Sequence, residues 1–489
     1  MSPLPKIAAV GVAAAVLALA PIPGSAQANV QKVLVIGVDG LMLDRIAAAD
    51  APALDNLIAT GSAAKTVLYA NPMAPTNSGP GWATIATGVW PDKHKVLSNS
   101  WGTNHNLGSN PDFLTRLERA DSTTSTYAIV TWSPLVDGSA GTPIFSTAID
   151  KRTASGGDQA TADQAAQHLR TTDADAGFIH FDDVDGAGHS CGAAGACYRD
   201  AITAVDKRIK QVLDAIAARP TRGQEDWKVI VTSDHGHTDS GGHGGNTPGE
   251  RASLIIEHGP GVPAGVPAVA PKNVDIAATV LATFGVTAPI DGRRLDDPPV
   301  DVFDSVPLNP RTHETGIPTS VLGYSQTPPS GWAINNAGLG SGGVAEWRGW
   351  SFTTDDFWTR TQAGQSRETN VRARGVFAVA DSDEWADRSY SGTFNSSLVS
   401  PAYNVTGKSQ VTVKFGSHYL KEGAETATVS VSFNGGANQT VLTYTGDVIA
   451  KLESLPVTLP AGTTSLRVTW RLANGNNNWY WAVDHPQVV

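Results

Sequence analysis

The segment from Val231 to Asn246, VTSDHGHTDSGGHGGN, concentrates side chains that bind divalent metal ions. Asp234 and His235 end an apolar run, and His243 follows in a glycine-rich turn. Carboxylate oxygens and imidazole nitrogens are ligands for zinc-like ions. A single histidine is more often a hydrogen-bonded structural group than a ligand, so a metal site requires matching groups elsewhere in the chain.

Three such groups follow two other apolar runs. Asp39 ends VLVIGVD, and Asp185 and His189 follow AGFIHFDDV. Each acid alone could be a helix cap. Together, the six groups match the ligands of two zinc-like ions, each with three protein ligands and an open position. We expect supporting or structural roles for the nearby His180, Asp182, His237 and Asp239.

A two-metal centre needs a nucleophile, and the segment 71–94 offers Ser78. Gly79 and Pro80 follow it, and residues 82–87 are compatible with a helix. Proline is favoured in the first helical turn, and a helix N-terminus directs its free amides at an anion. Contact with a metal would lower the pKa of the hydroxyl enough for attack near neutral pH. The alternative is an ordinary capped turn.

These residues must be brought together by an α/β domain. From residue 33 to about residue 304, apolar strand-like runs alternate with helix-like stretches, which predicts a mainly parallel sheet with helices on both faces. Ligands collect at the carboxyl ends of strands in such sheets. The predicted strands are 33–40, 126–132, 176–183, 227–234 and 252–258, and the predicted helices are 160–170, 198–218 and 274–284.

A second domain follows a break rich in proline and glycine at 298–331. Alternating runs such as TATVSVSF predict an antiparallel β-sandwich. We expect a catalytic domain at 29–305, a linker at 306–331 and the sandwich at 332–489. Eight of the thirteen tryptophans fall in the sandwich, where we favour core packing over a stacking platform for sugars. Asp381, Asp383 and Glu384 suit calcium, although a solvated acidic turn is the preferred interpretation.

The first 28 residues carry a signal peptide pattern, with Lys6, an apolar run and the small-residue site Ala26-Gln27-Ala28. An uncleaved anchor is the alternative, but the apolar run is short for a membrane span. The mature chain is therefore expected to be secreted or periplasmic, without stable membrane insertion. A disulfide between Cys191 and Cys197 is plausible there. The net charge of −11 and the lack of basic clusters argue against a nucleic-acid scaffold.

These motifs resemble the alkaline phosphatase superfamily, and within it the type I phosphodiesterase/nucleotide pyrophosphatase group. VDG, TIATG, WPDKH, DGAGH, SDHGH and GGHGGN occur in the order of the family between residues 33 and 295. The resemblance implies one metal held by Asp185, His189 and His243, and another held by Asp39, Asp234, His235 and the nucleophile. The register places the nucleophile at Ser78 rather than Thr76, and it places at Asn99 an asparagine that donates to a phosphoryl oxygen.

The chain also departs from this group. In nucleotide pyrophosphatases the last histidine ligand lies far beyond the DHG motif, whereas His243 follows it closely, as in the ethanolamine-phosphate transferases of the same group. Trp82 stands where sulfatases have an arginine, which disfavours sulfate esters.

We expect a secreted, metal-dependent phosphoric ester hydrolase with an alkaline phosphatase-like fold and two divalent ions, zinc by preference. Its reaction would be the cleavage of small-molecule or lipid phosphodiesters through a phosphoseryl intermediate at Ser78, with Asn99 and the amide of Gly79 binding the non-bridging oxygens. Two alternatives remain open. One is a phosphomonoesterase at the same site, and the other is an extracellular polysaccharide-binding protein with a degenerate catalytic domain and carbohydrate contacts through its sandwich.

Overall fold

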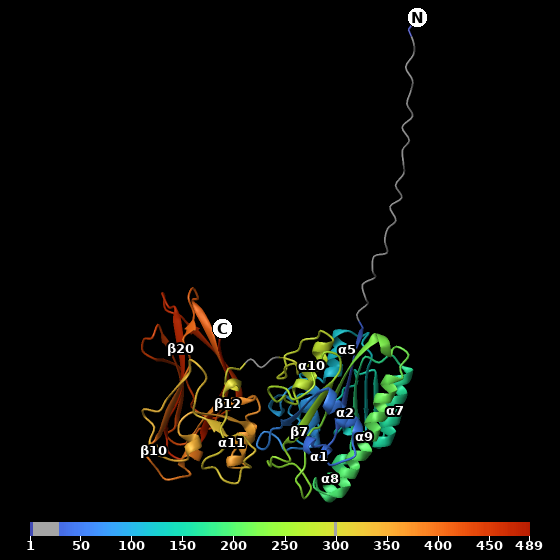
Figure 1. Ribbon diagram of the computed structural model, residues 1–489, viewed down its shortest axis with the longest axis horizontal. Coiled ribbons are helices and arrows are strands. Elements are labelled where there is room, and N and C mark those ends of the chain that lie inside the picture. The colour runs from blue at the N-terminus through green and yellow to red at the C-terminus, as the bar shows by residue number, and fades with distance from the viewer. Residues whose placement is uncertain (3–28, 298–300) are drawn as a thin grey trace.

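The computed structural model describes residues 1–2, 29–297 and 301–489, so the predicted signal peptide lies outside the described residues. These residues form an α/β domain and an all-β domain that lie side by side (Figure 1). In the part of the chain that is described, no helix has both the length and the apolar character needed to cross a bilayer.

The α/β domain is built on a seven-stranded sheet with the order β2-β7-β6-β1-β5-β3-β4. All neighbouring pairs are parallel except those made by β7, which runs antiparallel to both β2 and β6. The sheet is therefore mainly parallel, as predicted. Its strands are β1 (Val30–Val38), β2 (Ser62–Val67), β3 (Thr126–Val130), β4 (Lys151–Ala154), β5 (Ala176–Phe181), β6 (Glu225–Thr232) and β7 (Ala252–His258).

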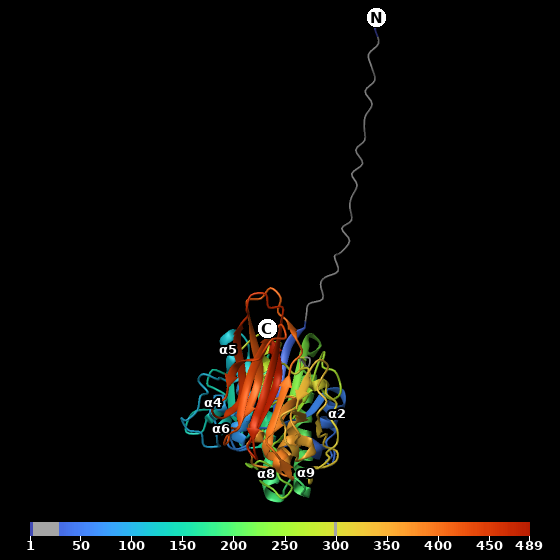
Figure 2. The ribbon, with the colours of Figure 1, turned by 90° about the vertical axis from the view of Figure 1, so that its left-hand side faces the viewer.

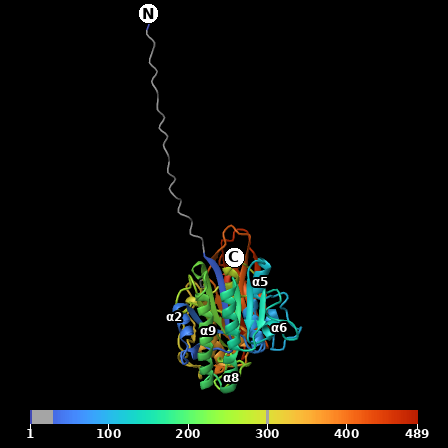
Figure 3. The same cartoon turned by 90° about the vertical axis from the view of Figure 1, so that its right-hand side faces the viewer.

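Helices cover both faces of this sheet because its strands are apolar on both sides. In β1, Leu34, Ile36 and Val38 point into one hydrophobic core and Val33 and Val35 into another. The first core is closed by α2 (Pro52–Thr60), α7 (Asp158–Thr171) and α9 (Ala196–Ala217), and α9 lies in front of the sheet in Figure 3. The second is closed by α3 (Ser78–Thr87), α5 (Phe113–Ala120) and α10 (Asp275–Thr283).

Short helices complete the domain. They are α1 (Leu43–Ile46), α4 (Pro91–His94), α6 (Pro134–Asp137) and α8 (Asp183–Cys191). A disulfide joins Cys191, at the end of α8, to Cys197 at the start of α9.

The second domain is a sandwich of two antiparallel sheets, whose strands face the viewer in Figure 2. One sheet has the order β19-β16-β21-β12-β11-β8 and the other β18-β17-β20-β14-β9, with β15 paired to β20. The strands are β8 (Tyr324–Ser325), β9 (Ala333–Asn335), β11 (Ser351–Thr354), β12 (Val376–Asp381), β14 (Phe394–Val399), β15 (Tyr403–Asn404), β16 (Gln410–Tyr419), β17 (Thr426–Phe433), β18 (Gln439–Thr443), β19 (Val448–Thr458), β20 (Ser465–Gly475) and β21 (Tyr480–Val488). A separate pair, β10 (Ser341–Gly342) and β13 (Tyr390–Ser391), and the helices α11 (Asp355–Thr361) and α12 (Ser382–Ala386) lie outside the two sheets.

The tryptophans of this domain pack its core. All of them except Trp479 are buried, and Trp479 itself is partly buried against the same cluster. Val306 and Ile317, in the segment expected to be a linker, also belong to this core. The segment therefore contributes apolar side chains to the sandwich.

Asp381 and Glu384 are buried and Asp383 is only partly exposed, so the solvated turn expected from the sequence is wrong. The fully buried guanidinium of Arg367 lies 3.2 Å from Asp381, 3.2 Å from Asp383 and 2.9 Å from Glu384. A buried charge needs a partner of opposite sign. Arg367, and not a calcium ion, supplies that positive charge to these carboxylates.

Arginine–aspartate pairs connect the two domains. Arg251, just before β7, places one nitrogen 3.0 Å from both carboxylate oxygens of Asp355, the first residue of α11. Arg374 bonds both oxygens of Asp275 at 2.7 Å, at the start of α10. The bidentate pair of Arg374 and Asp275 fixes orientation as well as distance.

Candidate active site

The predicted site residues gather at the carboxyl edge of the parallel strands. Asp39 directly follows β1, and Asp234 and His235 follow β6. Asp185 and His189 lie four residues apart on α8, the helix that follows β5. The last members are Ser78, the first residue of α3, and His243, in the loop before β7.

One group of side chains surrounds a single point. The Nε2 atom of His235 lies 3.3 Å from Ser78 Oγ, 3.3 Å from Asp39 Oδ1 and 3.3 Å from Asp234 Oδ2. Ligand bonds of about 2.0–2.1 Å to a tetrahedral zinc ion place neighbouring ligand atoms about 3.3 Å apart. The three distances from His235 Nε2 therefore match the spacing between ligand atoms around one zinc-like ion.

The chemistry of these atoms also fits a cation. The oxygens Asp39 Oδ1 and Asp234 Oδ2 are buried and have no hydrogen-bond partner among the described residues. Burial raises the pKa of both carboxyls well above the usual range, and the charge of Asp185 raises both further. Buried carboxylates of this kind are stabilised by a bound metal ion. His235 Nδ1 donates to the carbonyl of Gly236 at 3.1 Å, which leaves the Nε2 lone pair facing the two acids.

A second group lies beside the first and nearer to solvent. His243 Nε2 lies 3.1 Å from His189 Nε2 and 3.5 Å from Asp185 Oδ1, and His189 Nε2 lies 3.5 Å from Asp185 Oδ2. His243 Nδ1 donates to the carbonyl of Thr76 at 2.8 Å, so its Nε2 is also a free acceptor. The side chain of His189 is 52% exposed, which makes this group the open side of the site.

The two carboxylate oxygens of Asp39 make different contacts. Trp82 Nε1 donates to Oδ2 at 3.0 Å, and His180 Nε2 lies 3.2 Å from the same atom. These two contacts aim Oδ1 at His235. The role of Trp82 was missed from the sequence, because nothing in the local pattern shows that its indole reaches the end of β1.

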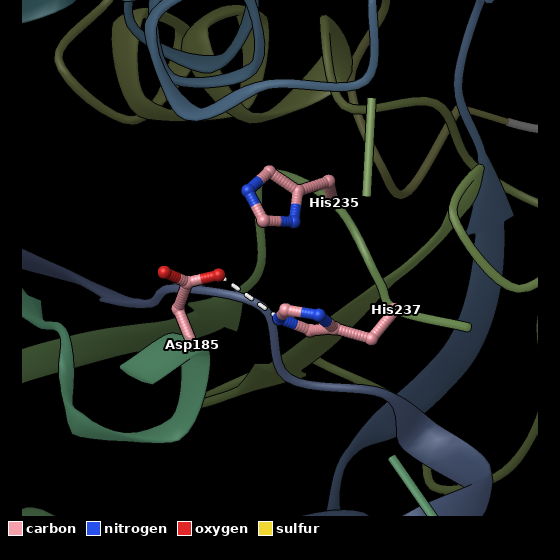
Figure 4. Close-up of side chains that lie close together, drawn as sticks. All are labelled: Asp185, His235 and His237. Carbon is pink, nitrogen blue, oxygen red and sulfur yellow. Dashed lines mark hydrogen bonds and ion pairs between the residues drawn. The ribbon is translucent and has the colours of Figure 1, made fainter. Parts of the chain in front are cut away.

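His237 holds Asp185. Its Nε2 lies 2.9 Å from Asp185 Oδ1, and Figure 4 shows the two side chains pointing toward each other. Although burial alone would raise it, the hydrogen bond from His237 helps to lower the pKa of Asp185 to about 2. The fully buried ring of His237 fits only because Gly40 and Gly188 lack side chains: a Cβ would lie 2.7 Å and 2.5 Å, respectively, from its Nε2.

The remaining neighbours divide into two kinds. Asp182 lies within 4.8 Å of Asp39 and His180, so it borders the site. Asp239 instead makes a surface ion pair with Arg45 at 2.6 Å. Asp182 therefore fits a supporting role at the site, and Asp239 fits the structural alternative.

The hydroxyl of Ser78 faces the metal-binding group and that of Thr76 does not. Thr76 Oγ1 donates to the carbonyl of Gly245 at 3.0 Å and accepts from the amide of Gly244 at 2.9 Å. Those bonds hold the loop that carries His243. The geometry therefore favours Ser78 as the nucleophile.

Asn99 is arranged differently from the expectation. Its Oδ1 accepts from the amide of Gly79 at 2.7 Å, so this amide, expected to bind substrate, is already engaged. Since only the oxygen can accept from an amide, the Nδ2 of Asn99 keeps its two hydrogens for another acceptor. Asn99 is thus hydrogen-bonded to Gly79, the residue that follows Ser78.

Parts of this chain are similar to known proteins. The family model for type I phosphodiesterase/nucleotide pyrophosphatase matches residues 33–157 and 109–246. GPI ethanolamine phosphate transferase 1 of Yarrowia lipolytica (strain CLIB 122 / E 150) is 32% identical over 96 residues, which are 20% of this chain and 10% of that protein.

Among solved structures, the chain is similar to murine ectonucleotide pyrophosphatase/phosphodiesterase 5 at 14% identity and a TM-score of 0.43, over 54% of this chain and 97% of that one. A putative sulfatase from Bacteroides thetaiotaomicron is 13% identical, with a TM-score of 0.44, over 66% of this chain and 82% of that one. The family match contains Ser78 and all six candidate ligands. The match with the family model extends over residues 33–246, which is less than half of the 489-residue chain.

Proposed function

We propose that this protein is a secreted phosphodiesterase that uses two divalent metal ions, preferably zinc, and forms a phosphoseryl intermediate at Ser78. The observation that carries the proposal is the equal spacing of 3.3 Å from His235 Nε2 to Ser78 Oγ, Asp39 Oδ1 and Asp234 Oδ2. A serine hydroxyl beside metal-binding side chains would be activated as a nucleophile when the ion is bound.

Two sets of residues would hold the ions. Asp39, Asp234, His235 and Ser78 form the buried set, and Asp185, His189 and His243 form the more exposed set. When bound, the ions would lower the pKa of the serine hydroxyl and neutralise charge on the phosphate and the leaving oxygen. Burial and His243 lower the pKa of His235, which keeps this imidazole neutral and able to act as a ligand.

The chain itself would position the phosphate for in-line attack. Ser78 Oγ forms a bond to phosphorus while the bond to the leaving oxygen breaks, and water later breaks the Oγ–phosphorus bond. The hydrogen bond from the backbone amide of Gly79 to Asn99 Oδ1 orients the carboxamide of Asn99. The Nδ2 group of Asn99 can then donate a hydrogen bond to a non-bridging oxygen. The N-terminus of α3 adds a favourable field for the anion.

The surroundings of Ser78 suit a diester. A monoester carries an additional negative charge, which is best met by a cationic side chain. Among the described residues, the hydrogen bonds and ion pairs of Ser78, Gly79 and Asn99 involve no lysine or arginine. A singly charged phosphodiester therefore fits better than a monoester.

Two features support export. The Cys191–Cys197 disulfide closes the end of the helix that carries His189, and disulfides persist in oxidising compartments. The signal peptide pattern in the first residues agrees with such a compartment.

Transfer to an alcohol is the second candidate reaction. It is favoured by the similarity to an ethanolamine phosphate transferase and by the close spacing of His235 and His243 along the chain. A phosphoseryl intermediate can be resolved by water or by an alcohol, so the two reactions differ only in the acceptor. Adding glycerol during turnover distinguishes the two reactions. A transferase forms a glyceryl phosphodiester, whereas a hydrolase releases a phosphomonoester.

The first test compares initial rates on bis-p-nitrophenyl phosphate and p-nitrophenyl phosphate after chelation and reloading with zinc. We expect the diester to react faster. Ser78→Ala should retain bound zinc and lose at least about a thousandfold in kcat, as expected when a nucleophile is removed. Ser100→Ala is the matched control on the neighbouring loop. Unchanged turnover in Ser78→Ala, or a faster monoester reaction, would contradict the proposal.

A further inference from the structure

A cavity of about 520 Å³ lies at the junction of the two domains, apart from the candidate active site. Its catalytic-domain side is lined by Val67, Val269 and Lys272, and its sandwich side by Leu308, Val376 and Phe377. This volume is within the range of pockets that bind small organic molecules, about 300–1,000 Å³. The walls are mainly apolar, so the side chain of Lys272 stands out.

Lys272 is buried, with 6% of its surface exposed. The two carboxylates that influence it are each bonded to an arginine: Asp355 to Arg251 at 3.0 Å and Asp275 to Arg374 at 2.7 Å. The five groups therefore carry three positive charges and two negative ones. Within the described ranges, no ion pair or hydrogen bond is made by the Lys272 ammonium.

The other charged groups at the cavity do not supply the missing anion. Asp356 pairs with Arg360 at 2.7 Å, and Asp304 accepts from the amide of Val376 at 3.0 Å. Lys65 is exposed and adds a further positive charge at the rim.

An unpaired ammonium in an apolar wall is costly. Burial lowers the pKa of Lys272 to about 8, because the charged form loses hydration without gaining a partner of its own. A buried lysine is expected to lose its charge or to find an anion. An anion that entered the cavity would supply the partner, and its apolar body would cover the hydrophobic walls.

We propose that this junction cavity binds a small amphipathic anion, with an apolar body against Val269, Val376 and Phe377 and one acidic group paired with Lys272. The acidic group is a carboxylate, sulfonate or phosphate, since each offers oxygens to an ammonium. The site does not depend on the proposed phosphodiesterase reaction, because none of the candidate metal ligands lines the cavity.

Two fluorescent dyes with the same aromatic body test the proposal on the full chain. 8-Anilinonaphthalene-1-sulfonate carries an acidic group, and N-phenyl-1-naphthylamine does not. We expect the sulfonate to saturate at a single site. Lys272→Met should weaken the sulfonate by about tenfold or more and leave the neutral dye unchanged, since a charged hydrogen bond is worth about 1.5–3 kcal/mol. Lys207→Met, at an exposed lysine of α9, is the matched control.

A competition experiment on the unmodified protein keeps the proposal testable if the variant fails to fold. Octanoate should displace the bound sulfonate, and octanol at equal concentration should displace much less. The proposal is overturned if the sulfonate shows no saturable binding, if Lys272→Met binds it as tightly as the unmodified chain, or if octanol competes as well as octanoate.

Discussion

Replacing Gly188 by alanine tests whether His237 positions Asp185. A Cβ at Gly188 would lie 2.5 Å from His237 Nε2 and 2.6 Å from two other ring atoms. The ring cannot move freely, because Gly40 lies against the same nitrogen. We therefore expect the Gly188→Ala variant to displace the ring and weaken its 2.9 Å bond to Asp185.

Gly186 provides a matched control on the same helix, α8. A Cβ there meets no atom within 4 Å. Both substitutions gain similar helix propensity, about 1 kcal/mol, so the difference between the two variants isolates the clash. Overpacking of this kind costs about 1–3 kcal/mol in the free energy of unfolding.

Loss of the His237 bond should also weaken zinc binding. Removing a hydrogen bond to a ligand typically costs about 10–100-fold in metal affinity. Denaturant titration of the metal-free variants would measure the free energy of unfolding of the α/β domain, and competition with a chelator would measure zinc affinity. Equal stability and equal zinc affinity in Gly188→Ala and Gly186→Ala would refute the positioning role of His237.

Two further substitutions separate the effects of buried charge. Asp234→Asn keeps an oxygen for the amide of Gly40 but removes an unpaired buried one, so the free energy of unfolding of the metal-free protein should rise by about 1–3 kcal/mol. Zinc should raise the melting temperature of this variant less than that of the unmodified chain, because only the set of Asp185, His189 and His243 keeps all its ligands. A metal-free variant less stable than the unmodified chain in calorimetry would argue against this. Burial raises the pKa of Glu425 from 4.5 to about 9, so the folded state keeps this proton when the unfolded state has lost it. The contribution of this proton to the free energy of unfolding is therefore complete below about pH 4 and is lost as the pH rises toward 9. Glu425→Gln should therefore be more stable than the unmodified chain by about 2–4 kcal/mol at pH 8 and similar at pH 4 in denaturant titrations. The exposed Glu422→Gln is the control, and identical pH profiles for the two variants would count against the reasoning.

The fold could be predicted from the sequence where strands are buried on both faces. β1, β5 and β6 each contain an apolar run, and such runs are typical of central strands in parallel sheets. The edge strands β2 and β4, with the sequences SAAKTV and KRTA, lack this signal because they are short and more polar. The direction of β7 was also hidden, since an apolar run does not show which way a strand runs.

Part of the candidate site could be predicted from the sequence for a related reason. Asp39, Asp234 and His235 directly follow apolar strands, so the strand ends locate them. Their partners were not accessible in the same way. Trp82 reaches Asp39 through a contact that depends on packing, and no periodicity in the sequence indicates it. The same is true of the contact between Arg367 and Asp381 in the sandwich.

The link between Arg251 and Asp355 bears on how the chain can be divided. Arg251 is buried, and it follows the loop that carries His243. A truncation at the proline-rich segment would remove the carboxylate of α11 and leave this guanidinium unpaired at the exposed edge of the catalytic half. The sandwich is thus a structural part of the catalytic domain's surface, and exchanging it for another module would require a replacement acid at the position of Asp355.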